Sequence, residues 1–275
     1  MASLNNDPVD GLVVDEVGAW ALDKHERLKK FIDASRGARA KFLPPRGTGG
    51  ASYIDLYSGP GRSQIRGTNR FIDGSPLVAY KAARQSNTRF SEIHLNDFDH
   101  ARSLAAQQRI AKLGGAAQAY GEPADVAVDR IIHALNPTGL HFAFLDPYEL
   151  EVLPFKIIRK LAALPNMDML IHVSVLDLQR NLRRYVDDGR VLDSFMPGWR
   201  AAVDINRSDQ GLRTDLLHYW LDEIRKLGTT PASGIELVSG PGNQRLYWLV
   251  FVSADALGQK LWDDVRNVTV QERLL

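Results

Sequence analysis

Short apolar segments alternate with helical patterns along the first two thirds of this chain, and this alternation limits the fold more than any other feature. Seven segments are typical of strands, at 52–56, 92–96, 117–120, 141–145, 167–173, 234–239 and 246–253. Helical patterns occupy 17–34, 76–85, 99–113, 124–135 and 154–164. Strands that alternate with helices build a parallel sheet covered on both sides. We therefore predict an α/β fold with a Rossmann-like, seven-stranded, mostly parallel sheet flanked by helices.

Two parts of the chain lie outside this alternation. Residues 1–50 are expected to form an N-terminal helical extension, and the polar, helix-rich stretch 177–230 is expected to be an insertion or lid after the fifth strand. The chain has 275 residues, of which 44% are hydrophobic, which is enough to bury one large core. We expect residues 1–275 to form a single domain.

Several classes of protein and site are disfavoured by what the sequence lacks. It has no run of 18 apolar residues, and its first residues do not follow the basic-then-apolar order of a signal peptide, so we expect a cytoplasmic protein with no membrane partner. Without cysteine the chain offers no disulfide, no iron-sulfur ligand and no thiol nucleophile. Its seven histidines form no H-x-H or H-x-x-x-H pair, and we predict no metal site.

The net charge is +1, but basic residues gather near the start of the chain. Eleven Lys or Arg side chains lie from Lys24 to Arg70, against Glu26, Asp33 and Asp55. This region could bind a nucleic acid through its phosphates, or it could be an ordinary solvated surface. The sequence leaves both interpretations open.

The segment "YIDLYSGPGRS", residues 53–63, ends a strand in a carboxylate and continues into a turn with two glycines. In parallel sheets the turn after the first strand commonly binds a nucleotide. The dinucleotide fingerprint requires a third glycine where Gln64 stands and an acidic residue about 20 positions on, and neither is present. An NAD oxidoreductase is therefore disfavoured.

A carboxylate followed by this bare turn suits a cationic ligand without a pyrophosphate, a description that S-adenosylmethionine fits. We predict that S-adenosylmethionine, or its product S-adenosylhomocysteine, contacts Asp55, Tyr57, Ser58, Gly59 and Gly61.

The ends of the second and third strands support the same ligand. Asp97 follows "EIHLN", and a carboxylate there can accept hydrogen bonds from both ribose hydroxyls, with Phe98 next to it. Asp99 can already fill the alternative role of helix N-cap. After the third strand, Glu122 is either a contact to the adenine amino group or part of a plain turn.

The fourth strand ends in "FAFLDPYEL", residues 142–150. Pro147 forces an extended conformation on Asp146, and Tyr148 then offers a flat aromatic face. An acidic residue, proline and an aromatic residue together are typical of methyltransferases that act on exocyclic amines, where the ring stacks on the base. Such enzymes usually carry a second proline, which is absent here, and a structural Asp-Pro turn is the alternative. We predict that Asp146, Pro147 and Tyr148 are the catalytic residues.

Taken together, the sequence resembles the family of three-Cys-motif partner proteins. The similar segments are "DKHERLKKFI", "YIDLYSGPG", "DGSPLVAYKAA", "HLNDFD", "FAFLDPYEL", "MDMLIHVSVLDLQRNL" and "LYWLVFVSADALGQKLWDDV", in this order across nearly the whole chain. The resemblance implies a class I methyltransferase fold. It also implies a separate partner protein with three cysteines, similar to radical-S-adenosylmethionine iron-sulfur proteins.

Two functions follow as hypotheses. The first is an S-adenosylmethionine-dependent methyltransferase that acts on a nucleobase or nucleic acid. The second is a catalytically silent subunit with the same fold that binds the three-Cys partner. Three carboxylates converging on one cleft, Asp55, Asp97 and Asp146, favour the enzyme.

Overall fold

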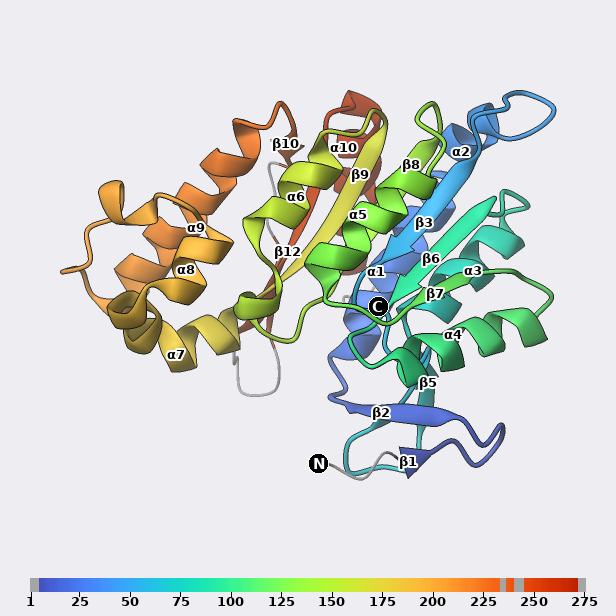
Figure 1. Cartoon of the computed structure of the whole chain (residues 1–275), viewed down its shortest axis with the longest axis horizontal. Coiled ribbons are helices and arrows are strands. Elements are labelled where there is room, and N and C mark those ends of the chain that lie inside the picture. Colours follow the sequence, from blue (N-terminus) through green and yellow to red (C-terminus); the bar gives the residue numbers. More distant parts are fainter. Residues whose placement is uncertain (1–4, 233–235, 240–244, 272–275) are drawn as a thin grey trace.

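A computed structural model describes residues 5–232, 236–239 and 245–271. Its main sheet has eight strands in the order β10-β12-β9-β8-β3-β6-β7, and β11 pairs with β12 (Figure 1). The strands are β3 Ala51–Asp55, β6 Glu92–Asn96, β7 Gln118–Tyr120, β8 Leu140–Leu145, β9 Met167–Ser174, β10 Thr230–Pro231, β11 Glu236–Ser239 and β12 Arg245–Ser253.

The predicted α/β class is confirmed, but the sheet is mixed and has one strand more than expected. The five strands β3, β6, β7, β8 and β9 pair in parallel. β12 runs antiparallel to β9, and β10 and β11 run antiparallel to β12. β10, the added strand, has only two residues, one of them Pro231, so it carries no periodic signal.

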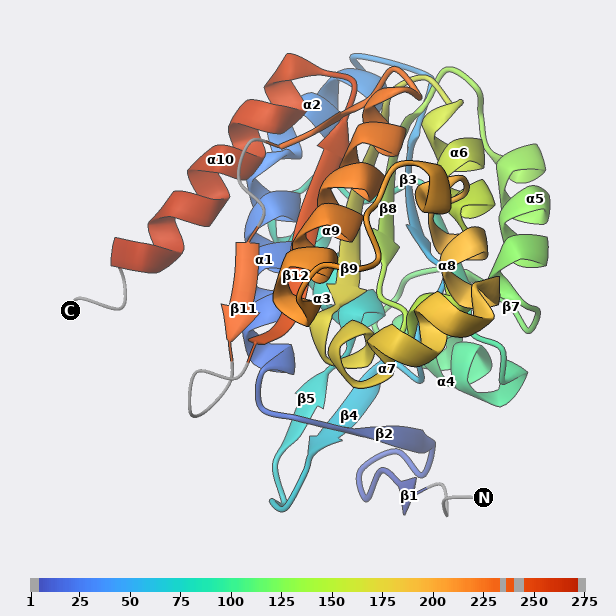
Figure 2. The ribbon, with the colours of Figure 1, turned by 90° about the vertical axis from the view of Figure 1, so that its left-hand side faces the viewer.

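Helices cover both faces of this sheet, as Figure 2 shows. One face packs against α1 Ala21–Ala34, α3 Ser75–Gln85, α4 His100–Lys112 and α10 Ala256–Gln271. The other packs against α5 Ala124–Ala134, α6 Phe155–Ala162 and the helices that follow β9. Alternate residues of β3 enter the two cores, Tyr53 on the first face and Ile54 on the second, as the two-residue period of a strand requires. No helix in the described part of the chain is long and apolar enough to cross a membrane.

The N-terminal part differs from the expected helical extension. Besides α1 and α2 (Arg36–Phe42) it contains β1 Asn5–Asn6 and β2 Val13–Val17, which join a second, four-stranded sheet with β4 Arg62–Ile65 and β5 Phe71–Asp73. Val17 therefore ends a strand, paired with Ile65, where the sequence predicted the start of a helix. The pairing partner of β2 lies about fifty residues away, so local propensity could not reveal it.

Arg109 of α4 fixes this small sheet beside the main one. The side chain is 3% exposed. Its Nε and Nη2 donate hydrogen bonds to the two carboxylate oxygens of Asp10, and both donor–acceptor distances are 2.8 Å. Its Nη1 donates to the carbonyl oxygens of Val13 and Pro60. One guanidinium thus ties the strand β2 and the glycine turn to the same helix.

The expected helical stretch after the fifth strand is present. It comprises α7 Val175–Asp188, α8 Arg190–Phe195, a 3-10 helix at Trp199–Ala201 and α9 Asp209–Arg225. Its core contains Trp199 and Trp220, both fully buried, and continues into the core of the main sheet. A further 3-10 helix, Leu150–Val152, follows β8.

Gly61 supplies a test of this packing. Its φ is +81°, and a Cβ there would lie 3.2 Å from Cα of Ala106 in α4. Gly67 has a similar φ of +72°, but a Cβ there would have no neighbouring atom within 4 Å. Both alanine substitutions carry the strain of a positive φ, but only Gly61→Ala also overpacks the core. We expect it to lower the free energy of unfolding by about 1 to 3 kcal/mol more than Gly67→Ala does, measured by denaturant unfolding. Equal losses would contradict this packing.

Candidate functional site

A cleft of about 1090 Å³ opens at the carboxyl ends of the parallel strands. The chain proceeds from β3 to β6 and β7 in one direction across the sheet and from β8 to β9 in the other, so the order reverses between β3 and β8. In open α/β sheets, ligands bind at this reversal. The predicted residues that line the cleft are Tyr57, Asp97, Phe98, Asp146, Pro147 and Tyr148.

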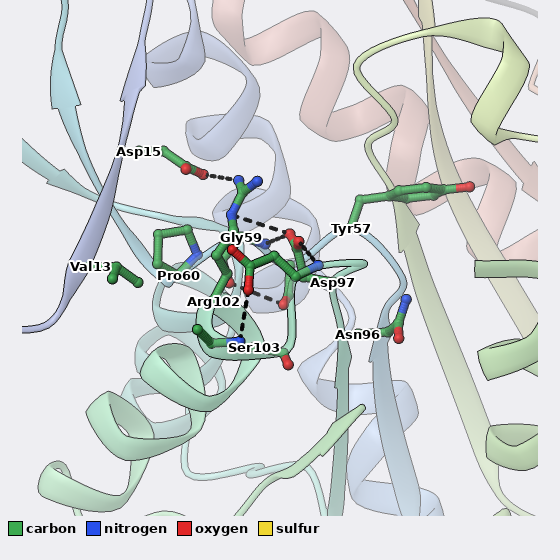
Figure 3. A network of polar contacts seen from close by, with 12 residues as sticks. Val13, Asp15, Tyr57, Gly59, Pro60, Asn96, Asp97, Arg102 and Ser103 are labelled. Carbon is green, nitrogen blue, oxygen red and sulfur yellow. Dashed lines mark hydrogen bonds and ion pairs between the residues drawn. The ribbon is translucent and has the colours of Figure 1, made fainter. Parts of the chain in front are cut away.

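Asp97 is the centre of a network of polar contacts at one end of the cleft (Figure 3). One carboxylate oxygen accepts a hydrogen bond from the backbone N–H of Gly59 at 3.1 Å, and the other from that of Asp99 at 3.0 Å. Nε of Arg102 lies 3.6 Å from Asp97. Burial raises the pKa of Asp97 above its ordinary value, although the charge of Arg102 opposes this effect. Each oxygen can still accept a second hydrogen bond from a ligand.

Sequence reasoning missed Arg102 and Asp15. The guanidinium of Arg102 lies between Asp97 and Asp15 of β2, and it forms an ion pair with Asp15 (Figure 3). Burial raises the pKa of Asp15, and Arg102 lowers it in part. The three β-branched valines of "VVDEV" could have indicated a strand at 13–17, but nothing local shows that this strand crosses the glycine turn.

The glycine turn is covered by protein and does not line the cleft. Gly59 has a φ of +55°, and a Cβ there would lie 2.8 Å from Oδ2 of Asp15. Gly61 packs against α4, and the buried Ser58 hydroxyl donates to the carbonyl of Gly59. These residues were predicted to contact the cofactor, but in the structure the glycines make room for β2 and α4.

Asp55 is also separated from the cleft. It is fully buried and accepts hydrogen bonds from the hydroxyls of Ser75 at 2.6 Å and Tyr53 at 2.9 Å. Burial raises the pKa of Asp55 to about 7. The sequence predicted a direct contact between Asp55 and the cofactor. In the structure Asp55 instead has a structural role, because it connects β3 to the start of α3.

Glu122 does not line the cleft either. Its side chain forms an ion pair with Arg130, and its carbonyl oxygen accepts a hydrogen bond from Nδ2 of Asn96 at 3.1 Å. Asn96 lines the cleft, as do Pro123, Ala124 and Asp125. The third strand thus reaches the cleft through the residues that follow Glu122.

Three aromatic side chains in the cleft wall are unusually exposed. Phe98 is 79% exposed, Tyr148 74% and Trp20 36%. Large exposed rings in a cleft offer faces on which a flat ligand can stack. Tyr57 differs from them, because its hydroxyl donates to the carbonyl of Val152 at 2.6 Å and burial raises its pKa.

Asp146 lies at the other end of the cleft, in a cluster with Lys24 and His172. Its Oδ2 pairs with Nζ of Lys24, and Oδ1 lies 3.5 Å from Nδ1 of His172. Burial alone would raise the pKa of Asp146, but Lys24 and His172 outweigh it, and the pKa lies below the ordinary value. Burial lowers the pKa of His172 to about 4, so this imidazole is neutral at pH 7. Its Nδ1 also lies 3.2 Å from the carbonyl oxygen of Pro147.

The charge of the cleft lining is strongly negative. Eight carboxylates line it against three cations, which are Lys24, Arg102 and Arg180. The carboxylates are those of Asp15, Asp97, Asp99, Asp125, Asp146, Glu149, Glu151 and Asp177. Two of the cations already pair with carboxylates of the cleft. This balance favours a cationic ligand.

Several basic side chains of the region from Lys24 to Arg70 are buried or paired with carboxylates. Lys24, Arg27 and Arg39 are buried, and Arg39 donates to the backbone and side chain of Thr88. Arg62 pairs with Asp7 at 2.6 Å. The number of basic side chains that a nucleic acid could reach along this region is therefore smaller than the sequence suggests.

Two other features of the described residues bear on the choice of site. A second hollow, of about 410 Å³, lies at the amino ends of β8 and β9, whereas the cleft lies at the carboxyl ends of the parallel strands. None of the predicted site residues lines this hollow. In the part of the chain that the structure describes, no group of three or more His, Cys, Asp or Glu side chains could hold a metal ion.

Comparisons with known proteins reveal a likeness of fold. No family model matches the chain, and a search of the curated proteins finds no match. Among solved structures, the chain is similar to protein LPL1258 from Legionella pneumophila str. Philadelphia 1, described as family-model DUF519, with a TM-score of 0.51 and 9% identity over 89% of this chain and 91% of that one. A putative Zn-dependent alcohol dehydrogenase from Rhodobacter sphaeroides aligns with a TM-score of 0.33 and 10% identity over 83% and 98% of the two chains, which is too weak to carry an argument. The protein shares its α/β fold with LPL1258 over most of both chains.

Proposed function

We propose that this protein is a methyltransferase of the class I fold that uses S-adenosylmethionine to methylate an exocyclic amine of a nucleobase, free or within a nucleic acid. The observation that carries the proposal is that Asp97 and Phe98, from the end of β6, line the same cleft as Asp146 and Tyr148, from the end of β8. The four residues lie on either side of the point where the strand order reverses. We also propose, on the basis of the sequence, that the protein acts in the cytoplasm.

The end of the cleft near β6 suits the cofactor. Asp97 would accept hydrogen bonds from the ribose hydroxyls, and the exposed ring of Phe98 would cover the adenine. When bound, S-adenosylmethionine would supply a methyl group from a cationic sulfur to the acceptor nitrogen, with loss of the C–S bond, formation of an N–C bond and release of a proton from that nitrogen. The excess of carboxylates over cations in the cleft lining would stabilise that positive charge.

The end near β8 suits the amine that receives the methyl group. Asp146 would accept a hydrogen bond from the amine, and Tyr148 would stack on the ring that carries it. Pro147 fixes the backbone between these two side chains. Holding both reactants in one orientation would supply most of the rate enhancement.

A second candidate function is a catalytically silent subunit that binds a three-Cys iron-sulfur partner. One observation favours it: β2 and Arg102 cover the glycine turn, so that Ser58, Gly59 and Gly61 do not line the cleft. A silent subunit would bind S-adenosylmethionine weakly or not at all. The resemblance to the three-Cys-motif partner family is compatible with both candidates.

Replacing Asp97 by alanine tests the proposed function. We expect affinity for S-adenosylhomocysteine to fall by about 1 to 3 kcal/mol, because hydrogen bonds to a charged group are lost. Isothermal titration calorimetry measures this change, and Asp129→Ala, an exposed carboxylate on α5, serves as the matched control. Unchanged affinity in the Asp97 variant would remove the main support for the proposal.

A further inference from the structure

We propose that Lys24 is a positioning residue of the acceptor end of the cleft, which through its pair with Asp146 makes the site selective for a neutral amine over an alkylammonium. This inference rests on the proposed function, because it assumes that an amine binds beside Asp146. The selectivity between the two forms of amine can be measured without methyl transfer.

Lys24 reaches the cleft from a helix that is distant in sequence. It belongs to α1, is 9% exposed and lines the cleft. Its Nζ pairs with Oδ2 of Asp146 and lies 5.8 Å from the centre of the Tyr247 ring. A buried lysine requires such partners, and the pair fixes the orientation of the carboxylate.

The other oxygen of Asp146 keeps the capacity to accept a hydrogen bond. Its neighbour, Nδ1 of His172, lies 3.5 Å away, which is long for a strong hydrogen bond, and the same nitrogen is nearer to the carbonyl of Pro147. Oδ1 is therefore the atom that an acceptor amine can approach. The charged and titratable groups around Asp146 include Lys24, His25, Tyr53, Asp55 and His172, with the Tyr247 ring beside them.

The charge of Lys24 decides which form of an amine is favoured beside Asp146. An ionised carboxylate without a partner stabilises an ammonium ion next to it and raises the pKa of the amine. An ammonium has no lone pair and cannot accept a methyl group. Lys24 compensates the charge of Asp146, so the carboxylate stabilises the ammonium form less. The neutral, nucleophilic form of the amine is then favoured beside Asp146.

Neither Asp146 nor His172 is an efficient proton acceptor, and Asp55, whose pKa is about 7, is fully buried and does not line the cleft. The pKa of Asp146 lies below its ordinary value, and that of His172 is about 4. The proton released after methyl transfer would therefore pass to water. This suits an aromatic exocyclic amine, whose methylated cation is strongly acidic, better than an alkylamine, whose cation retains its proton at pH 7.

The test compares two probes on the full-length protein loaded with S-adenosylhomocysteine. Adenosine presents a neutral exocyclic amine, and butylammonium presents an alkylammonium. We expect Lys24→Met to shift the ratio of the two dissociation constants at least about tenfold in favour of butylammonium, and Asp146→Asn, which leaves Lys24 alone, to shift it in the opposite direction. The double variant should return towards the wild-type ratio, because both charges are removed together. Lys24→Arg and the exposed Lys29→Met should keep that ratio.

The outcomes separate this inference from the proposed function. A wild-type ratio in both single variants overturns the inference, and so does failure of the wild-type protein to bind either probe. If Lys24→Met does not fold, Asp146→Asn and the double variant decide the question by the same ratio. If the wild-type protein does not bind S-adenosylhomocysteine, the proposed function is contradicted. The ratio of the two dissociation constants, measured on the protein without cofactor, would still test the role of Lys24.

Discussion

Asp146→Asn is expected to reduce methyl transfer by about 10²- to 10³-fold, the loss found when one preorganised polar group is removed from an active site. The asparagine keeps an acceptor oxygen, but it removes the negative charge that Lys24 pairs with, so the orientation of both side chains is lost. Affinity for S-adenosylhomocysteine should change little, because the cofactor end of the cleft is built around Asp97. Transfer of a radioactive methyl group to adenine- and cytosine-containing oligonucleotides measures the first effect, and calorimetry the second.

Tyr148→Ala is the companion variant for this experiment. Tyr148 is 74% exposed, so its removal costs the fold little. If the acceptor is a nucleobase, stacking worth about 1 to 3 kcal/mol is lost. Loss of cofactor binding in Tyr148→Ala would make this segment part of the cofactor wall. If Asp146→Asn and Tyr148→Ala both transfer methyl groups at the wild-type rate, the segment "LDPYEL" is a structural turn and has no role in the reaction.

The second large effect concerns the dependence of stability on pH. Burial raises the pKa of Asp55 from 3.8 to about 7. Between these two values the folded protein binds more protons than the unfolded chain, so the free energy of unfolding falls as the pH rises. The contribution of Asp55 falls by about 3 kcal/mol between pH 4 and pH 7.

The variant Asp55→Asn isolates this contribution, since an amide does not titrate. We expect its free energy of unfolding to fall less steeply than that of the wild-type protein over the same window. Asp168, whose pKa burial raises to about 6, acts in the same direction in both proteins and cancels in the comparison. Denaturant unfolding at several pH values gives the two curves, and parallel curves would contradict the buried, protonated state of Asp55.

The central sheet was predictable because its signals are local. Strands β3, β8 and β9 are almost fully buried and appear as short, mainly apolar runs between turns, whereas β6, "EIHLN", shows the alternation of apolar and polar residues that is typical of a strand. The helical pattern predicted at 76–85 corresponds to α3, which has Pro76 in its first turn. Such features depend on neighbouring residues alone.

The small sheet and its consequences for the site could not be predicted in this way. β2 pairs with β4 across about fifty residues, and Asp15 meets Arg102 only because of this pairing. The two glycines of the turn were interpreted as room for a ligand, but the space beside them is taken by Asp15 and Ala106. A glycine shows that something approaches the backbone closely and does not show what approaches it.

Asp146 illustrates a third case, in which the residue was found but its environment was not. The order Asp-Pro-Tyr placed it at the end of a strand, and the structure has it in the cleft. Its partner Lys24 lies 122 positions earlier and was counted as part of a basic surface. An ion pair between residues of different helices or strands cannot be predicted from the sequence pattern, because it depends on how these elements pack against each other.

The most direct test of the central claim is calorimetry of the purified wild-type protein with S-adenosylmethionine, S-adenosylhomocysteine and NAD. The proposed function predicts that the first two bind, each at one site per chain, and that NAD does not. Binding of NAD, or of none of the three, would contradict it.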